Sequence, residues 1–279
     1  MSSVISIKGA TRLYPIIGDP IAQVRSPEVF SARFAAAGIP AICIPVHVPA
    51  ERFDAIVPAL LALGNVDGLI ATVPFKPRML PFADRLGRAA QTVGALNALR
   101  READGSWSGD MFDGMGFIHG AQKKGERLAG RSVVQFGAGG AGSAIACGLA
   151  EAGVKAIAVI DQDTAKAEAL VGKLGRAFPE CAVSAVRELP SAFDMVVNAS
   201  PVGMKPGDGL PGAIGRLDPR TLVGDVVILP DRSPMIRHAI ECGCRYVDGR
   251  EMMDGQVDAL LAFFAAAGGV RGSRAGASS

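Results

Sequence analysis

A glycine cluster near the middle of this chain has the residue types and spacing suited to phosphate binding, and a lysine and an aspartate stand at the ends of predicted strands before it. The cluster reads Gly137-Ala-Gly-Gly-Ala-Gly142 and fits the pattern G-x-G-x-x-G. A short run rich in β-branched residues, 132–136, precedes it, and small residues at helical spacing follow it. In this pattern the first glycine permits a tight turn, the second lets the backbone approach a pyrophosphate, and the third lets helix and strand pack closely. The start of the helix would offer free N–H groups to the phosphates.

An acidic residue downstream supports a dinucleotide site. Asp161 follows the predicted strand 154–160, about 20 residues beyond the last glycine, where a carboxylate accepts hydrogen bonds from the adenine ribose. Two carboxylates, Asp161 and Asp163, come before the first cation, Lys166. A 2′-phosphate needs Arg or Lys close by, so the segment favours NAD, and Lys166 leaves NADP as the alternative. The structural alternative is a glycine-tolerant helix start beside an ordinary surface aspartate.

Lys76 stands where α/β sheets present their ligands. The predicted strand 68–73 leads into Thr72-Val-Pro-Phe-Lys76, so Lys76 follows the carboxyl edge of a sheet. Asp113 precedes Gly114 and a helical pattern over 115–124. By themselves, these two residues are better explained as a solvated helix start and a helix cap.

Alternating strands and helices must position these residues. Ser26 before Pro27 predicts a helix N-cap with proline at the first helical position. Asp104-Gly105 predicts the turn of a β-hairpin. The strands are expected at 13–18, 41–48, 68–73, 94–99, 105–114, 182–185, 193–198, 222–230 and 245–249, and the helices at 28–37, 50–63, 115–124, 164–173 and 252–268.

This order predicts an α/β fold with two domains. The first, the substrate-binding domain, is expected at 1–118 and is completed by the closing helix 252–268. The second, a Rossmann dinucleotide-binding domain, is expected at 119–251, with the active site in the cleft between the two. Residues 269–279 are rich in Gly, Ser and Arg and predict a flexible tail.

The composition excludes several classes of protein. The chain has 279 residues, of which 49% are hydrophobic, and a net charge of +2 without a clustered basic run, which argues against nucleic-acid binding. Its apolar stretches are interrupted or amphipathic, and no signal peptide or membrane span is predicted. Five cysteines without a C-x-x-C pair are typical of reduced thiols in the cytoplasm. Cys242 and Cys244 lack partners at metal-ligand spacing, so no metal site is expected.

Taken together, the motifs resemble those of shikimate dehydrogenases and their quinate/shikimate relatives along nearly the whole chain. The segment 18–27 resembles that family's G-N-P-I/V-x-H-S-x-S-P, and 72–76 matches its T-V-P-x-K. Four further segments, 94–97, 109–114, 198–204 and 249–256, resemble G-A-x-N, G-x-N-T-D-G, N-A/T-S/T-x-x-G-M and G-x-x-M-x-x-x-Q. The resemblance implies an oxidoreductase that transfers a hydride between NAD or NADP and a cyclic hydroxy acid such as shikimate or quinate.

The resemblance also implies roles for individual residues. Lys76 and Asp113 would form the acid–base pair: a base takes the hydroxyl proton when a secondary alcohol is oxidised, and an acid returns it in the reverse direction. The substrate-binding residues would be Ser26, Thr72, Asn97 and Gln256. The cofactor-binding residues would be Gly137, Ala138, Gly139, Gly140, Ala141, Asp161, Asn198 and Ser200, with Gly249 and the backbone at Val226 near the nicotinamide.

Two departures put the substrate in doubt. The first serine of the family's S-x-S pair is Val24, and the tyrosine expected near the end of a later strand is Ile228. Losing a hydrogen bond to a charged ligand group costs roughly 1.5–3 kcal/mol. Arg25 could supply a cationic clamp on a substrate carboxylate, or it could be an ordinary surface arginine.

Three hypotheses therefore compete. The first is a dehydrogenase of the shikimate/quinate type that prefers NAD. The second is an NAD-binding sensor or regulator that has lost turnover, which Val24 and Ile228 favour and the pair Lys76 and Asp113 opposes. The third is an oxidoreductase on a related scaffold, such as a methylene-tetrahydrofolate dehydrogenase, which the same pair also opposes. The expected partner is a small-molecule substrate, with no nucleic acid and no membrane, and a homodimer is left open.

Overall fold

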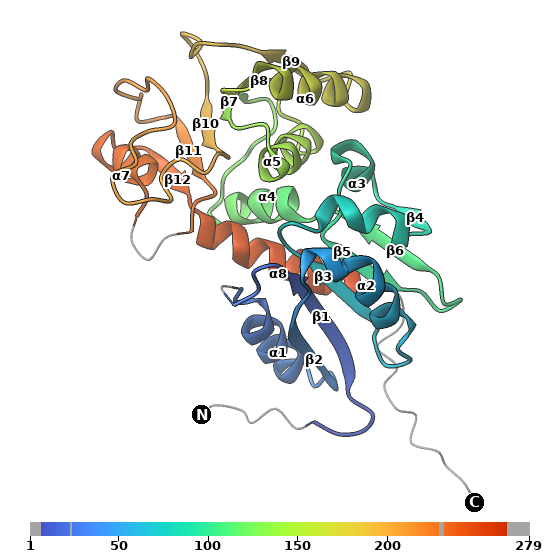
Figure 1. Cartoon of the computed structure of the whole chain (residues 1–279). Helices are drawn as coiled ribbons and strands as arrows, with labels where there is room; N and C mark the ends of the chain where they lie inside the picture. The colour runs from blue at the N-terminus through green and yellow to red at the C-terminus, as the bar shows by residue number, and fades with distance from the viewer. Residues whose placement is uncertain (1–6, 23, 229–231, 267–279) are drawn as a thin grey trace, which may run out of the picture. The chain divides into compact units, whose positions relative to one another are not determined.

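The computed structural model describes residues 7–22, 24–228 and 232–266 (Figure 1). The chain divides by its contacts into two compact units, Met1–Met111 with Val257–Ser279 and Phe112–Gln256, which we call unit 1 and unit 2. Within the described residues, no helix is both long enough and apolar enough to cross a membrane. The tail predicted at 269–279 and the end of the helix predicted at 252–268 lie outside the described residues.

Unit 1 is built on a six-stranded mixed sheet in the order β2-β1-β3-β5-β6-β4. Strands β2, β1 and β3 are parallel, as the alternation of strands and helices predicts, and the hairpin β5-β6 joins β3 in the antiparallel sense. The elements are β1 Arg12–Gly18, α1 Ser26–Ala36, β2 Ala41–His47, η1 Ala50–Arg52, α2 Phe53–Ala62, β3 Gly68–Ala71, η2 Lys76–Phe82, β4 Arg85–Leu86, α3 Arg88–Val93, β5 Ala98–Arg101 and β6 Trp107–Asp110.

Unit 2 is built on a six-stranded parallel sheet in the order β12-β11-β10-β7-β8-β9. This is the strand order of the Rossmann fold, whose ligand crevice lies where the order reverses, between β7 and β10. The elements are α4 Asp113–Lys123, β7 Ser132–Phe136, α5 Gly140–Glu151, β8 Ala156–Ile160, α6 Thr164–Ala177, β9 Ala182–Ala185, β10 Met195–Asn198, β11 Leu222–Asp225, α7 Pro234–Glu241 and β12 Arg245–Val247. The predicted α/β class and the Rossmann domain are confirmed.

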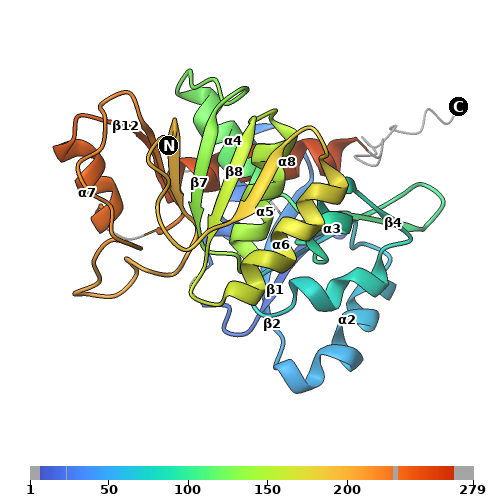
Figure 2. The same cartoon turned by 90° about the horizontal axis from the view of Figure 1, so that it is seen from above.

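Alternate residues of the unit 2 strands face two layers. Val134, Val196 and Val223 pack with Met235 of α7 in one apolar core. On the other face, α5 and α6 lie together over β7 and β8 (Figure 2). Burial on both faces is expected for parallel strands that are covered by helices on both sides.

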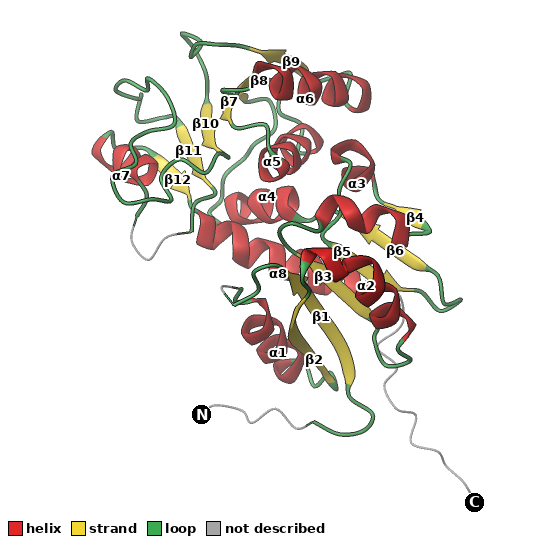
Figure 3. Cartoon of the chain, in the orientation of Figure 1, coloured by secondary structure: helices red, strands yellow, loops and turns green. Residues whose placement is uncertain are grey.

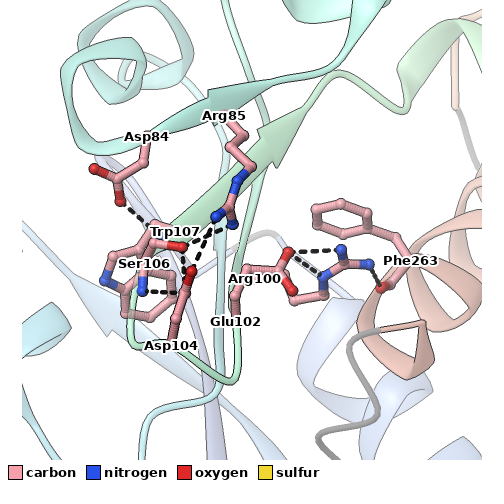
Figure 4. A network of polar contacts seen from close by, with 8 residues as sticks. All are labelled: Asp84, Arg85, Arg100, Glu102, Asp104, Ser106, Trp107 and Phe263. Carbon is pink, nitrogen blue, oxygen red and sulfur yellow. Dashed lines mark hydrogen bonds and ion pairs between the residues drawn. The ribbon is translucent and has the colours of Figure 1, made fainter.

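The last helix, α8, spans Gly249–Ala265 and so passes from unit 2 into unit 1 (Figure 3). Within unit 1, Phe264 packs on Tyr14 of β1 with ring centroids 4.8 Å apart. The end of α8 is also held by Arg100 of β5, which donates to the carbonyl oxygen of Phe263 and pairs with Glu102 at 2.7 Å (Figure 4). An arginine on the last carbonyls of a helix satisfies groups that have no partner within the helix.

Two predicted helix caps are wrong. Helix α1 begins at Ser26 itself, because Arg25 already has helical backbone angles and takes the cap position without a side-chain hydrogen bond. Helix α4 begins at Asp113 with Phe112 at the cap position, also without a side-chain hydrogen bond, so Asp113 lies in the first turn and does not cap it. The second correction matters for chemistry, since it leaves the Asp113 carboxylate available for other partners.

Candidate active site

The glycine loop of unit 2 has the geometry that phosphate binding requires. Gly137 has a φ of +99°, which residues with a side chain rarely adopt. A Cβ at Gly142 would overlap the carbonyl oxygen of Gly137, so the third glycine allows the helix to begin close to the strand. Cβ atoms at Gly139 and Gly140 would meet nothing within 4 Å, so the middle of the loop is open to an approaching ligand. The first turn of α5 leaves N–H groups without helical partners beside this opening.

Asp161 lies against the same loop. One of its carboxylate oxygens accepts a hydrogen bond from the Ala138 N–H at 2.7 Å, and the other accepts from the Asp163 N–H at 2.9 Å. Asp163 in turn caps α6 by accepting from the Ala165 N–H and pairs with Lys166 at 3.6 Å. The first cation after β8 is therefore engaged by a carboxylate of its own helix start.

Asn198 and Ser200 lie on the other side of the switch point. The backbone at Ala199 donates to Phe136 at 2.8 Å, and a Cβ at Gly137 would lie 2.7 Å from the Ala199 carbonyl oxygen. The fully buried Asn198 side chain accepts from the Ser200 hydroxyl at 2.7 Å and donates to Asp225 at 3.0 Å. The loop after β10 is thus folded directly onto the glycine loop.

Asp225 is a site residue that the motifs did not predict. Its carboxylate is fully buried at the end of β11 and accepts from Asn198, from the Ser233 hydroxyl and from the Val227 N–H at 3.0 Å. Ser233 caps α7, so one carboxylate joins two strand ends to a helix start. Burial raises the pKa of Asp225 to about 6 although these hydrogen bonds favour the ionised form. Its only signal in the sequence is an acidic residue inside the apolar run 222–228.

Val226 and Gly249 lie next to this network. The Val226 N–H donates to the Asn198 carbonyl oxygen at 3.0 Å. A Cβ at Gly249 would lie 2.7 Å from both the Val226 carbonyl oxygen and Ile228, so α8 starts in contact with this backbone. The Ile228 side chain is 52% exposed, which is high for a large apolar residue.

Asp113 is placed by its neighbours in unit 2. It is 4% exposed, and the Gln256 amide donates to its carboxylate at 2.5 Å. A Cβ at Gly114 would overlap the carbonyl oxygen of Ala144 in α5, and one at Gly255 of α8 would overlap the carbonyl oxygen of Gly116. Helix α4 therefore touches the backbone of the glycine-loop helix and of α8, and brings the predicted catalytic residue Asp113 together with the predicted substrate residue Gln256.

Two predicted substrate residues, Thr72 and Asn97, and the predicted catalytic residue Lys76 lie at one edge of the unit 1 sheet. Asn97, 2% exposed, precedes β5, and its carbonyl oxygen accepts from the Ala71 N–H at 2.8 Å, next to Thr72. The carbonyl oxygen of Lys76 accepts from the Leu96 N–H at 3.0 Å. The backbone thus brings Thr72, Lys76 and Asn97 together at the carboxyl ends of β1 and β3.

The loop between β1 and α1 carries one of the two departures from the family pattern, Val24. Arg25 is exposed and pairs with Glu28 at 3.3 Å, with side chains 62% and 71% exposed. Such a pair is typical of a solvated surface and contributes little to stability. Ser26 is half-buried in the first turn of α1.

Comparisons with known proteins place these features in a family context. Residues 16–99 match the shikimate dehydrogenase substrate binding domain, and 119–202 match shikimate / quinate 5-dehydrogenase. The chain is 37% identical to a shikimate dehydrogenase (NADP(+)) of Rubrobacter xylanophilus, over 75% of this chain and 74% of that one. Among solved structures, it is similar to shikimate 5-dehydrogenase from Listeria monocytogenes in complex with shikimate and NAD, with a TM-score of 0.87, 28% identity and 93% of each chain covered.

Two further structures broaden the range of activities among similar proteins. Quinate dehydrogenase from Corynebacterium glutamicum in complex with NAD has a TM-score of 0.83 and 30% identity, with 92% of this chain and 94% of that chain covered. A 5-ketofructose reductase of Gluconobacter sp. has a TM-score of 0.84 and 28% identity, with 91% and 92% covered.

The buried carboxylate of Asp225 predicts a specific dependence of stability on pH. Its folded pKa of about 6 exceeds the ordinary value of 3.8, so between these values the folded state holds the proton more tightly than the unfolded state does. The free energy of unfolding should therefore fall by roughly 2–3 kcal/mol from about pH 4 to pH 7 through this group. Asp225→Asn removes that contribution. The free energy of unfolding of the wild type minus that of the variant, measured by urea titration, should therefore fall over the same pH range.

Asp218 provides a control of opposite sign. It is an exposed carboxylate whose pKa is lowered to about 2 by the Arg220 side chain. For Asp218→Asn, the free energy of unfolding of the wild type minus that of the variant should be largest at neutral pH and should decrease as the pH falls. A difference for Asp225→Asn that stays constant with pH would contradict the assigned burial effect.

Proposed function

The chain belongs to the shikimate and quinate dehydrogenase family, and from this premise we propose that it oxidises a cyclic hydroxy acid of the shikimate or quinate type with NAD, reversibly. The observation that carries the proposal is the pair of polar edges: the glycine loop with Asp161 and Asn198 in unit 2, and Thr72, Lys76 and Asn97 in unit 1. The first suits a dinucleotide and the second a substrate rich in hydroxyl groups.

The residues of unit 2 fit a nicotinamide dinucleotide. The open backbone at Gly139 and Gly140 and the start of α5 would hold the pyrophosphate, and Asp161 would accept from the adenine ribose. Asn198, Ser200, Val226 and Gly249 would lie toward the nicotinamide. When bound, the cofactor supplies the hydride chemistry, and the protein supplies binding and orientation.

Lys76 and Asp113 are proposed to handle the proton. In the oxidation, the amine of Lys76 takes the proton of the substrate hydroxyl as the carbon gives up its hydride, and the product is a ketone. In the reduction, the ammonium returns that proton. Asp113, held by Gln256, would orient the amine and the hydroxyl, and Thr72 and Asn97 would bind neighbouring hydroxyl groups.

Two features support NAD over NADP in this proposal. The Asp161 carboxylate lies on the glycine loop, where its charge would repel a 2′-phosphate. Lys166, the nearest cation along the chain, is already paired with Asp163. The relative from Rubrobacter xylanophilus is named for NADP(+), so this chain would differ from it in cofactor preference.

The substrate is proposed to be a family acid that is recognised differently. Val24 and Ile228 remove two hydroxyl groups from the family pattern, and the exposed Ile228 offers an apolar contact in place of one of them. Arg25 could bind a carboxylate beside Glu28 or in its place, because a guanidinium has five donors and an exposed ion pair is weak. The cytoplasmic location and the possible homodimer remain predictions from the sequence.

Lys76→Ala tests the catalytic proposal. With purified protein, shikimate or quinate and NAD, nicotinamide absorbance should report turnover in the wild type and a loss of about 10²–10⁴-fold in kcat in the variant, because the proton acceptor is gone. The affinity for NAD, measured by calorimetry, should be unchanged. The matched control is Lys155→Ala, an exposed lysine before β8, which should keep wild-type turnover.

The outcomes separate the hypotheses. Full activity of Lys76→Ala would overturn the assigned role of the lysine. NAD binding by the wild type without turnover on either acid would instead support the sensor hypothesis over the dehydrogenase.

Asp161→Asn tests the cofactor preference. The wild type should have a higher kcat/KM with NAD than with NADP. The ratio of these two values should be about tenfold lower in the variant, because the charge that repels the 2′-phosphate is removed. Glu180→Gln is the control, since it removes an exposed carboxylate after α6 and leaves both Asp161 and the pair of Asp163 with Lys166 in place. A wild type that prefers NADP would contradict the proposal.

A further inference from the structure

Gln135 is a buried polar residue in an otherwise apolar strand. It lies on β7 two residues before Gly137 and has no exposed surface. Its direct neighbours across the sheet, Val159 on β8 and Val197 on β10, are apolar and fully buried. Neither the motifs nor the proposed function assigns it a role.

The side chain of Gln135 reaches both ends of the glycine loop. Its amide nitrogen donates to the carbonyl oxygen of Gly137 at 2.9 Å and to that of Gly142 at 2.8 Å. Carbonyl oxygens only accept hydrogen bonds, so the NH₂ group of the amide must face them. One side chain therefore bridges the first and the last glycine of the G-x-G-x-x-G pattern.

The other end of the same amide supports a specific function. The Gln135 carbonyl oxygen is buried and has no hydrogen-bond partner among the described residues. An unpaired buried acceptor is unfavourable, and a valine or leucine would fill the strand without it. The favourable part of this arrangement is the pair of bonds to the loop.

These bonds act on the part of the loop that a ligand would use. They hold the carbonyl oxygens of Gly137 and Gly142, while the backbone between them, at Gly139 and Gly140, has open space in front of it. Fixing the ends of a short loop fixes the directions of the N–H groups between them. Preorganised donors bind an anion more tightly because less ordering accompanies binding.

We propose that Gln135 is a positioning residue for cofactor binding, whose amide ties the two ends of the glycine loop and thereby aims the N–H groups of the first turn of α5 at the dinucleotide phosphates. The inference rests on the proposed function, because it assumes that the loop binds a dinucleotide. It concerns binding only, so kcat at saturating cofactor should not depend on Gln135.

The test compares Gln135→Met, which conserves volume without a donor, with Val159→Ala, which weakens the same sheet beside it. The dissociation constants for NAD and for ADP-ribose should rise at least about tenfold in Gln135→Met, and kcat at saturating NAD should stay within about twofold of wild type. Amide hydrogen exchange in the unliganded variant should be faster at 138–142. In Val159→Ala the melting temperature should fall while both dissociation constants stay near those of wild type.

Each outcome has one meaning. If Gln135→Met is too unstable to purify, Gln135→Leu takes its place in the same comparison. Dissociation constants and loop exchange equal to those of wild type would overturn the inference and leave the proposed function standing. An equal loss of affinity in Val159→Ala would also overturn it, since the effect would then be one of general stability. A wild type that binds neither NAD, NADP nor ADP-ribose would overturn the proposed function itself.

Discussion

The architecture of unit 2 depends on close approach between helix backbones at α4. Gly114 lies against the backbone of α5, and Gly116 and Gly255 bring α4 and α8 into direct contact, where a single Cβ would overlap a carbonyl oxygen. This packing places Asp113 and Gln256 within one hydrogen bond of each other, on helices that share a layer with the glycine-loop helix. Asp113, which we propose takes part in the proton transfer, is thereby fixed relative to the proposed cofactor loop by backbone contacts, which leave less freedom than side-chain contacts do.

A second constraint acts at the switch point between β7 and β10. Two buried polar side chains outside the recognised motifs hold the loops there: Gln135 ties the glycine loop, and Asp225 joins Asn198 to the start of α7. The buried carboxylate of Asp225 accepts three hydrogen bonds, whereas the Gln135 amide uses its NH₂ group on the loop and leaves its carbonyl oxygen without a partner among the described residues. We infer that these hydrogen bonds fix the shape of the loops that would meet a cofactor before it binds.

The sequence was sufficient for features that depend on neighbours along the chain. The strand, glycine loop and helix around Gly137 are local, so their pattern predicts them, and the two-domain α/β class follows from the order of elements. Asp225 could not be predicted, because its hydrogen bond to Asn198 depends on the strand order and joins residues that are 27 positions apart. The partners of Gln135, Gly137 and Gly142, are close in the sequence, but the glycine pattern does not specify a side chain that bridges its two ends. Short elements such as β4, with two residues, have no periodicity to detect. The proposed roles of Lys76 and Asp113 depend on the family resemblance, since each residue also has an ordinary local explanation.

Amide-resolved hydrogen exchange of the wild type, with and without ligands, tests the central claim most directly. We expect NAD alone to protect the glycine loop at 137–142 and the loop at 198–203, and added shikimate or quinate to protect 72–76 and the backbone at Asn97. Protection by NAD that leaves both unit 2 loops unchanged would contradict the account, and so would substrate protection confined to segments away from the edge formed by Thr72, Lys76 and Asn97.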